Sequence, residues 1–576
     1  MIGLFALFLN KGRTDNYKFP ENQCEDTGFL YNEIDGGTYY IRRRMLNKFP
    51  EDKLFFQDEN IHVCIDGLFL NRGDMEKKYH EKIEGLIGKK YVNEELGAFV
   101  NEIRGSFSGV ITDMNKQEIC VFTDHLALKP VFYLLFENGI IAASEVYEIA
   151  RFCRCNHIDI HLDFCGAYSM LTYGYMYENC TLIKEVKKLR EGTILHYTNE
   201  KLFFETYHTI KNETITISEE DAVVKIEQLF RQALELEVKK NKQYNYENVI
   251  PLSAGMDCRM TSYAFKKMFN QHAVNFTYSE TGEYDYTTSS KMASELNNRW
   301  IFKSLDNGLD LYSIDEAVKL SDGLIYYAWP AQLNDFLKLV NTRNWGVIHT
   351  GVLGDIVVGT FVKENSPAYY NLGDGAFSTK MIEKLKKYSC VKEKNYEIGM
   401  IQNRGINGAC LGYALTFRHY AEDLSPFLNI DFFDFCLSIP IEMKQKHKLY
   451  YTWVERFYPE AKKYKHNGVS LKGSKTIKFQ GKEYRICAIP DLLVNTIRSR
   501  IKSNYGMNPF QSWYDNNHEL QEIMKKYYLE NKHEIKEWKE LYKDTKWLFV
   551  HGNAKEKIQV LSLLGSVKLM FREENT

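Results

Sequence analysis

The sequence predicts two parts: an α+β N-terminal part, then an α/β part with a doubly wound parallel sheet and a helical C-terminal region. Three observations predict this. Over residues 1–205, short apolar strands are separated by turn residues. From about residue 217, strand patterns alternate with helix patterns, which is typical of a parallel sheet covered by helices on both faces. Residues 510–574 carry amphipathic helical patterns with alternating charge.

Composition bounds the class of protein. The chain has 576 residues, of which 44% are hydrophobic and 26% charged, so it can bury a large core. The formal net charge of −2 favours neither a nucleic-acid nor a membrane partner. The 12 cysteines are mostly scattered singly, as in proteins with reduced thiols. Since no run of about 20 apolar residues occurs, we expect a cytoplasmic protein, and a homodimer remains open.

The N-terminal part is predicted to begin with a buried strand over Met1–Leu9, which lacks the basic residues that precede a signal peptide. Further strands are predicted over Ile61–Ile65, Gly109–Thr112 and Glu118–Phe122. The turn signals between strands are Asp35-Gly36-Gly37, Asp66-Gly67, Arg72-Gly73-Asp74 and Glu137-Asn138-Gly139.

One alternating pattern in this part suggests a metal site. His157, Asp159, His161 and Asp163 would share one face of a strand. No further ligand or partner for them can be named, so a solvated strand or turn is expected instead.

The second part is predicted to open with a helix over Ala222–Leu236, capped by Ser218. Ligands of parallel sheets bind at the carboxyl ends of the strands, where Ser253, Ser279 and Gly351 fall. The predicted strands are Val249–Leu252, Ala273–Tyr278, Trp300–Lys303 and Gly346–His349, and the predicted helices are 258–269, Thr287–Leu296 and Ile314–Leu320.

The loop Ser253–Cys258 joins a predicted strand to a predicted helix. A helix N-terminus offers unpaired N–H groups to an anion, and Gly255 allows the backbone to approach a phosphate. Ser253 adds a hydroxyl donor, and Asp257 can hold Mg²⁺. An ordinary strand-to-helix turn with a Ser/Asp cap explains the same residues, so the local pattern leaves both interpretations open.

This loop resembles the Ser-Gly-Gly-x-Asp-Ser pyrophosphate loop of the asparagine synthetase family. Ser253, Gly255 and Asp257 match, whereas Ala254 and Cys258 replace a glycine and a serine. The resemblance implies binding of ATP and pyrophosphate by Leu252, Ser253, Ala254, Gly255, Met256, Asp257, Cys258, Thr277 and Gly351.

The stretch His349–Gly359 resembles a second loop of the same family, Ser-Gly-Glu-Gly-x-Asp-Glu-x-x-Gly-Gly. Its match at Asp355 implies that Asp257 and Asp355 together hold Mg²⁺. A plain turn, with Asp355 as a helix cap, is the alternative. The two glutamates of the family loop are Val352 and Ile356 here, so we expect amine handling to differ from asparagine synthesis.

Residues 1–205 resemble the class II glutaminase domain of this family, which has an Ntn-type fold. The matching stretches are Met1–Phe5, Ile103–Ser108, Thr123–Pro130 and Ala143–Glu145. Ile2 stands where the family has its nucleophilic cysteine, and Asp66 stands where an asparagine helps to bind the oxyanion. We therefore expect a degenerate glutaminase-like domain over residues 1–205 and an ATP-pyrophosphatase domain over residues 215–576.

The stretch Ala461–Gly481 contains no acidic residue but several lysines. In the family, a lysine in a late loop stabilises the transition state, which implies a catalytic role for Lys465 or Lys472. A solvated basic loop is the alternative. Arg404 and Arg418 are further candidates for binding a substrate carboxylate.

Taken together, the resemblances imply an ATP-dependent amide-forming ligase that adenylates a carboxylate and passes the acyl group to ammonia or a substrate amine. The carboxylate would belong to a small molecule, peptide or glycan, in natural-product or surface-glycan biosynthesis. One alternative is an asparagine synthetase that uses free ammonia. A second is a catalytically degenerate protein that binds ATP or a partner.

Overall fold

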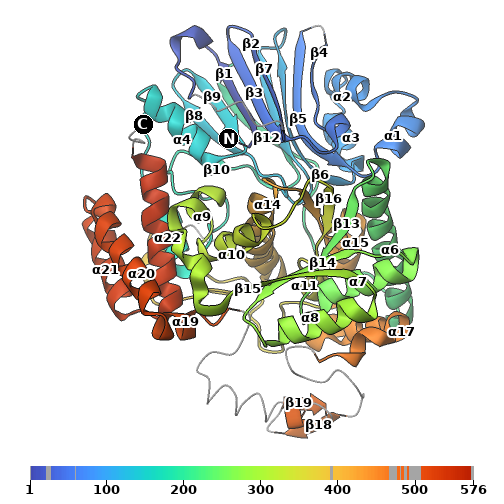
Figure 1. Ribbon diagram of the computed structural model, residues 1–576. Coiled ribbons are helices and arrows are strands. Elements are labelled where there is room, and N and C mark those ends of the chain that lie inside the picture. Colours follow the sequence, from blue (N-terminus) through green and yellow to red (C-terminus); the bar gives the residue numbers. More distant parts are fainter. Residues whose placement is uncertain are drawn as a thin grey trace.

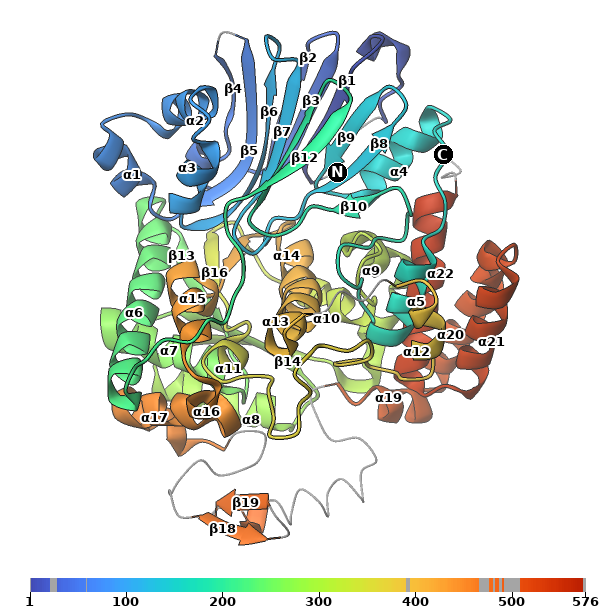
Figure 2. The same cartoon turned by 180° about the vertical axis from the view of Figure 1, so that it is seen from behind.

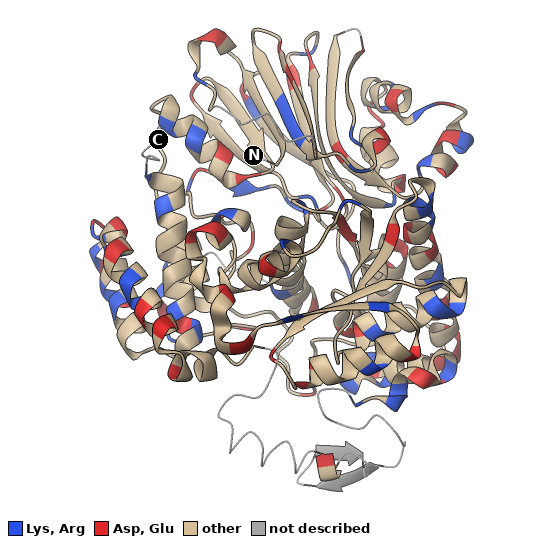
Figure 3. Ribbon diagram, in the orientation of Figure 1, with Lys and Arg blue, Asp and Glu red and all other residues tan. Residues whose placement is uncertain are grey.

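The computed structural model describes residues 2–20, 28–58, 60–389, 394–465, 476–479, 482–485, 489–491 and 508–572. Figure 1 shows the strands of the N-terminal part above a second part in which helices surround one sheet. Lys and Arg residues, in blue, and Asp and Glu residues, in red, are interspersed along the ribbon (Figure 3). Among the described residues, no helix is long and apolar enough to cross a membrane.

The N-terminal part contains two antiparallel six-stranded sheets. The first sheet consists, in spatial order, of β10 (Lys187–Lys188), β8 (Phe132–Phe136), β9 (Gly139–Ala143), β1 (Gly3–Leu9), β3 (Tyr39–Leu46) and β2 (Phe29–Asp35). The second consists of β12 (Lys201–Thr206), β11 (Thr193–Thr198), β7 (Glu118–Thr123), β6 (Gly105–Asp113), β5 (Ile61–Phe69) and β4 (Phe55–Asp58).

Alternating side chains of β1 explain how these sheets stack. Leu4 and Phe8 point to one face and pack against the second sheet. Phe5 and Leu7 point to the other face and pack against the helices α4 (Val146–Cys155) and α5 (Phe164–Tyr173). The far face of the second sheet is covered by α1 (Arg72–Tyr79), α2 (Ile83–Val92) and α3 (Leu96–Glu102). The result is a helix–sheet–sheet–helix stack, which confirms the α+β prediction.

Two of the four predicted turns are confirmed, since Asp35–Gly37 joins β2 to β3 and Glu137–Gly139 joins β8 to β9. The turn prediction for Asp66-Gly67 is wrong, because both residues lie inside β5. The prediction for Arg72–Asp74 is also wrong, because these residues form the first turn of α1.

The second part is built on a five-stranded parallel sheet, as predicted. Its strand order runs outwards from β13 in both directions, so the winding turns back between β13 and β16. The strands are, in spatial order, β15 (Arg299–Ser304), β14 (Val274–Ser279), β13 (Glu247–Pro251), β16 (Trp345–His349) and β17 (Glu422–Leu424).

Helices lie on both faces of this sheet because successive side chains of β13 point in opposite directions. Ile250 packs on one side with α6 (Glu219–Gln243), α7 (Met256–Phe269), α8 (Tyr284–Glu295) and α17 (Lys448–Phe457). Val249 packs on the other side with α9 (Ile314–Leu320), α10 (Ala328–Leu337) and α14 (Leu411–Phe417). The structure thus confirms one part of the predicted doubly wound fold, namely a parallel sheet with helices on both faces. The predicted cap is also present, since the Asp221 N–H donates to Ser218 Oγ at 3.1 Å.

The C-terminal region is helical, as predicted, and consists of α19 (Phe510–Asn516), α20 (His518–Asn531), α21 (Lys539–His551) and α22 (Ala554–Phe571). Helix α22 packs beside α5 and α4 of the N-terminal part (Figure 2). Gln559 Nε2 donates to the Met170 carbonyl at 3.0 Å, and one hydrophobic core includes residues from both parts. The division into domains 1–205 and 215–576 stays a prediction.

Candidate active site at the carboxyl ends of the parallel strands

Two loops meet where the strand order turns back. The first follows β13 and leads into α7, and the second follows β16 and leads into the short helix α11 (Gly354–Val357). A Cβ atom added at Gly351 would lie 2.5 Å from the Cys258 backbone nitrogen. One added at Gly354 would lie 2.7 Å from Asp257 Cγ. These two glycines therefore allow a close approach between the loops, beyond what a plain turn requires.

The side chains of Asp257 and Asp355 are neighbours across this contact. Burial, followed by the nearby Asp355 carboxylate, raises the pKa of Asp257 well above its ordinary value. Neither carboxylate forms an ion pair with a lysine, arginine or histidine among the described residues. Two adjacent acidic oxygen donors without a counter-charge fit a divalent cation such as Mg²⁺.

The loop Ser253–Gly255 places several N–H groups at the N-terminus of α7. The helix begins at Met256, two residues earlier than predicted, so Asp257 lies in its first turn. The Ala254 N–H donates to Asp285 Oδ1 at 2.7 Å, and the Gly255 N–H donates to Ser253 Oγ at 3.1 Å. Two of the donors predicted to bind phosphate are thus satisfied within the protein.

Three of the other predicted binding residues support the loop from inside. Leu252 and Met256 are buried in the core beneath it. Thr277 Oγ1 donates to the Leu252 carbonyl at 2.7 Å, so its hydroxyl group holds the end of β13 in place. Burial raises the pKa of the Cys258 thiol to about 12, so Cys258 is a neutral donor at this position.

Arg259 links the loop to a distant segment and was not assigned a role from the sequence. The guanidinium group is fully buried, and burial lowers its pKa to about 10. Nη2 donates to the carbonyls of Ala254 and Lys465 at 2.7 and 3.0 Å. Nη1 donates to the carbonyls of Ala461 and Tyr464 at 2.8 and 2.9 Å. No local pattern marks such a contact, because about two hundred residues separate its two sides.

Arg259 therefore brings the backbone of Lys465 close to the loop after β13. The Lys465 side chain itself is about half exposed, and its Nζ lies 2.5 Å from Asp491 Oδ1. Lys472, the other predicted catalytic lysine, lies outside the described residues. The catalytic role of either lysine stays a prediction.

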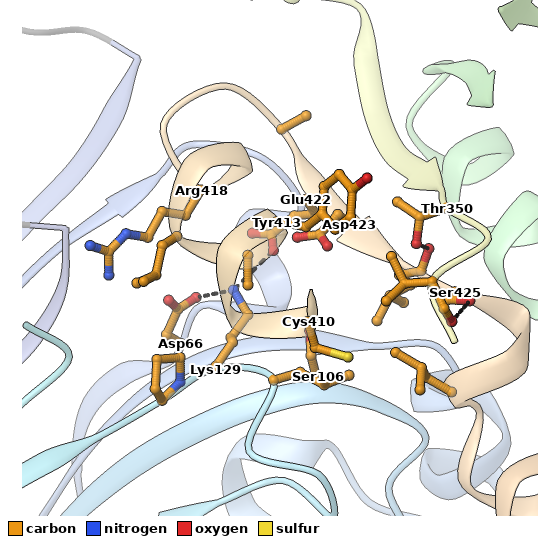
Figure 4. Close-up of a pocket in the computed structure, with 18 of the residues that line it drawn as sticks. Asp66, Ser106, Lys129, Thr350, Cys410, Tyr413, Arg418, Glu422, Asp423 and Ser425 are labelled. Atoms are coloured by element: carbon orange, nitrogen blue, oxygen red, sulfur yellow. Dashed lines mark hydrogen bonds and ion pairs between the residues drawn. The ribbon is translucent and has the colours of Figure 1, made fainter. Parts of the chain in front are cut away.

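A cavity lies between the two parts of the chain, beside the second loop (Figure 4). It contains about 710 Å³ of space not filled by atoms, part of it continuous with solvent. At the N-terminal side it is lined by Ile2 and by Asp66, and at the other side by Thr350 and Val352, which flank Gly351. The cavity thus extends from the position of the family nucleophile to the edge of the candidate site.

Buried charges surround the N-terminal side of this cavity. Lys129 Nζ lies 3.0 Å from Asp66 and 2.9 Å from Glu422, and Lys53 pairs with the same two carboxylates. Burial alone would raise the pKa of Asp66, but the ammonium groups of Lys129 and Lys53 lower it below the usual range. Asp66 is therefore an ionised carboxylate where the family has a neutral amide.

Two side chains of the alternating His157–Asp163 stretch have partners elsewhere in the protein. His161 Nδ1 lies 2.9 Å from Glu185 Oε1, and Asp163 Oδ1 accepts the Cys165 N–H at the start of α5. Within the part of the chain that the structure describes, one group of three or more side chains has metal-ligand spacing: Glu118, Cys120 and His196, on the second antiparallel sheet.

The predicted arginines also have partners inside the protein. Arg418 Nη2 lies 3.0 Å from Glu145 Oε1, on the N-terminal side of the cavity. The Arg404 guanidinium stacks over Phe361, with 5.6 Å from Cζ to the ring centroid. Contact of either with a substrate carboxylate stays a prediction.

Comparison with known proteins adds a family likeness. Residues 89–208 match a family described as a glutamine amidotransferase domain. A stretch of 107 residues, 17% of this chain, is 28% identical to asparagine synthetase [glutamine-hydrolyzing] 2 of Bacillus subtilis (strain 168) and covers 14% of that protein. A stretch of 171 residues, 28% of this chain, is 21% identical to amidase chry2 of Gibberella zeae and covers 24% of it. The matches thus span less than a quarter of each relative.

Two solved structures are also similar. One is an allosteric regulatory enzyme of purine biosynthesis, at 11% identity and a TM-score of 0.23, over 47% of this chain and 67% of that chain. The other is the glutamine phosphoribosylpyrophosphate amidotransferase of B. subtilis, at 10% identity and a TM-score of 0.24, over 47% of this chain and 78% of that chain. Scores this low carry no argument about the fold.

Proposed function

We propose that the chain is an asparagine synthetase-like, ATP-dependent amide-forming ligase, a proposal supported by its similarity to amidotransferases. In this proposal it adenylates a substrate carboxylate with release of pyrophosphate. It then transfers the acyl group to ammonia or to a substrate amine. The substrates would belong to natural-product or surface-glycan biosynthesis, and the chain itself would not hydrolyse glutamine.

One observation carries this proposal: Asp257 and Asp355 lie together, without a counter-charge among the described residues, at the N-terminus of α7. Carboxylate oxygens beside a helix N-terminus can accept Mg²⁺ and a phosphate chain at one place. When bound there, Mg²⁺ would neutralise the charge of the pyrophosphate leaving group. The donor set of the site fits this role because both ligands are hard oxygen atoms.

The residues of the chain would act in two steps. In the first, an oxygen of the substrate carboxylate attacks the α-phosphorus of ATP, and the bond from that phosphorus to the pyrophosphate breaks. The backbone N–H groups of Ser253–Asp257 would hold the pyrophosphate, and its arrival would displace Asp285 from the Ala254 N–H. In the second, an amine nitrogen attacks the acyl carbon and AMP leaves. Lys465 or Lys472 would stabilise the charge that develops in each step.

Two side chains support the proposal that the chain does not hydrolyse glutamine. Ile2 is buried and carries no atom that could attack an amide. The ionised Asp66 would repel the negative charge of a tetrahedral intermediate instead of stabilising it. We expect ammonium, but not glutamine, to serve as a nitrogen source, and release of glutamate from glutamine by the purified protein would contradict this.

The ligase is tested by measuring the exchange of labelled pyrophosphate into ATP. The probe carboxylates are L-aspartate, D-glucuronate, β-amino acids and peptides with a free C-terminal carboxylate. We expect at least one of them to support exchange. Asp257→Asn and Asp355→Asn should each reduce it at least 100-fold, a loss of about 3 kcal/mol of transition-state stabilisation. Asp159→Asn, at an exposed aspartate between α4 and α5, should exchange at the wild-type rate.

The same assay separates the two alternatives. An asparagine synthetase is favoured by the Bacillus subtilis relative and predicts asparagine from L-aspartate, ATP and ammonium. Val352, which stands where the family has a glutamate, argues for a different amine step. Binding of ATP without exchange on any carboxylate would instead indicate a degenerate ATP-binding protein.

A further inference from the structure

Three side chains with metal-binding chemistry lie on the helix-covered face of the second antiparallel sheet. Glu118 and Cys120 are two residues apart on β7, so their side chains share a face. His196 of the neighbouring strand β11 lies directly opposite Cys120 in the register. Cys120 belongs to the hydrophobic core beneath α2 and α3. The three side chains are thus held between the sheet and its helices, and none of them is among the residues that line the cavity described above.

One ring nitrogen of His196 faces both of the other side chains. Nδ1 lies 3.1 Å from Cys120 Sγ and 3.0 Å from Glu118 Oε1. A neutral imidazole nitrogen either donates or accepts a hydrogen bond, so Nδ1 cannot donate to the carboxylate and accept from the thiol at once. In a tetrahedral zinc site, a nitrogen ligand lies about 3.3–3.5 Å from the neighbouring oxygen and sulfur ligands. The observed distances are shorter by only roughly 0.3–0.4 Å, so a small outward shift admits an ion.

A second layer of polar groups contacts the atoms that face away from this space. The Tyr91 hydroxyl of α2 donates to Glu118 Oε2 at 2.6 Å. On the other side of the imidazole ring, His196 Nε2 lies 3.5 Å from Glu205 Oε2, on the edge strand β12. Gly97 of α3 leaves room for this carboxylate, because a Cβ atom there would overlap Glu205 Oε1. In metal sites such partners orient the ligands, since they fix the imidazole tautomer and the direction of the carboxylate.

The two carboxylates lack the usual cationic partners. Among the described residues, no lysine or arginine lies within ion-pair distance of Glu118 or Glu205. Lys116 is close enough to affect Glu118, but its Nζ lies over the Tyr91 ring, 4.8 Å from the centroid. A buried carboxylate needs a compensating positive charge. Here either a protonated His196 or a bound cation would supply it.

The donor atoms favour zinc among the common divalent ions. They are one sulfur, one nitrogen and one oxygen atom, whereas Mg²⁺ and Ca²⁺ prefer oxygen ligands alone. All three are typical ligands of Zn²⁺, which binds four ligands in a tetrahedron, so a water molecule would take the fourth position. Burial, followed by the charge of Glu118, raises the pKa of the Cys120 thiol well above its ordinary value. The thiol is therefore neutral without a metal and gives its proton to solvent when Zn²⁺ binds.

We propose that Glu118, Cys120 and His196 form a zinc site that fastens the second sheet to its helical cover. The ion would bind Cys120 Sγ, His196 Nδ1 and one oxygen of Glu118. It would thereby join β7 to β11 and, through the hydrogen bond from Tyr91, join both strands to α2. The role is structural. It does not depend on the proposed ligase, because the three ligands belong to neither of the two loops of the candidate active site.

The test measures metal binding by the full chain. The purified protein is dialysed against EDTA, loaded with ZnCl₂, passed through a desalting column and assayed for zinc by elemental mass spectrometry. Loading with CoCl₂ instead reports the ligands, because a thiolate bound to Co²⁺ gives a charge-transfer band in the near ultraviolet. We expect the wild type to retain zinc in a 1:1 ratio to the chain and to show the thiolate band with cobalt.

Variants of the ligands and of their support should weaken zinc binding to different degrees. Cys120→Ser and His196→Gln each remove a ligand and should lower the affinity about 100-fold or more, whereas Tyr91→Phe, which removes only a supporting donor, should lower it about 10–100-fold. Zinc should raise the unfolding temperature of the wild type but not that of Cys120→Ser. Cys153→Ser, at another buried cysteine, is the matched control and should bind zinc as the wild type does.

Three results would overturn the zinc site. The first is a wild type that retains no zinc, and the second is an equal zinc affinity in the wild type and Cys120→Ser. The third is a cobalt band that persists in Cys120→Ser but is lost in Cys258→Ser, which would place the ion beside Asp257. If Cys120→Ser does not fold, as judged by circular dichroism, the same comparison is made with His196→Gln. The ligase stands or falls separately, by pyrophosphate exchange.

Discussion

Tyr450 and Asp257 are joined by a hydrogen bond of 2.8 Å from the tyrosine hydroxyl to Oδ1, across 193 residues of sequence. The bond brings α17 into contact with the first turn of α7. It lowers the pKa of Asp257 and so opposes part of the rise caused by burial and Asp355. The acidic pair is therefore supported by a third element besides the two loops.

Removing this bond should weaken the fold. Tyr450 is buried, so Tyr450→Phe removes the hydroxyl donor from Asp257 while it preserves the packing of the ring. We expect the free energy of unfolding to fall by about 1–2 kcal/mol, as for a buried bond to a charged group. Urea unfolding measures it. Tyr369→Phe, at a tyrosine that is 54% exposed, should unfold as the wild type does, and an equal loss in both variants would contradict the prediction.

Asp257→Asn should stabilise the metal-free protein although it destroys exchange activity. The folded pKa of Asp257 is raised, so its ionisation costs stability progressively as pH rises above the unfolded value of about 3.9. At pH 7 in EDTA, Asp257→Asn should therefore unfold at a higher temperature, with a gain of about 1 kcal/mol or more. The gain should vanish below about pH 4. A less stable variant at pH 7 would show that the two carboxylates do not repel each other.

Arg259→Lys should detach the segment around Lys465 from the loop after β13. The guanidinium group donates hydrogen bonds to four carbonyls. A lysine ammonium could bind only some of them, and the other carbonyls would stay buried without a donor. We expect a loss of about 2–3 kcal/mol in thermal unfolding and faster tryptic cleavage near Lys463. Arg456→Lys, at an exposed ion pair with Glu220, is the matched control and should change little.

The charge cluster of Lys53, Asp66, Lys129 and Glu422 should make the contact between the two parts sensitive to acid. The pKa values of Asp66 and Glu422 are lowered, so the stability they supply is complete above their unfolded values and is lost as pH falls below about 4. The protection factors of the amides in β5 and β17, which are corrected for the intrinsic exchange rate at each pH, should fall in that range. Protection that is unchanged down to pH 3 would contradict this.

Asp66→Asn tests the same cluster at neutral pH. It restores the amide of the family but leaves two buried ammonium groups with one carboxylate, so we expect a loss of about 3 kcal/mol. Glutaminase activity should not return, because Ile2 still lacks a nucleophilic atom. Asp159→Asn, at an exposed aspartate, is the control for stability.

The parallel sheet was predictable because its signal is local and periodic. Buried strands and amphipathic helices alternate, so Ile314–Leu320 was predicted with the observed ends, and the strands were placed to within two or three residues. The same kind of local pattern led to a wrong prediction of a turn at Asp66-Gly67. There the strand continues because Lys53 and Lys129 neutralise the aspartate, and partners so far along the chain leave no local mark.

The candidate site was predictable only in part. The spacing of Ser253, Gly255, Asp257, Gly351 and Asp355 carries the family likeness, and the structure brings these residues together. The supporting contacts of Tyr450, Arg259 and Asp285 depend on how distant segments pack, which no short pattern encodes.

The packing of α22 against α4 and α5 has a consequence for synthesis of the chain. The N-terminal part leaves the ribosome first, yet the surface of α5 that receives Gln559 stays uncovered until α22 has been translated. Nascent chains that stop before α22 should therefore expose apolar surface on an otherwise folded N-terminal part and become targets for chaperones. Synthesis of α22 would then decide whether the N-terminal part is released from chaperones.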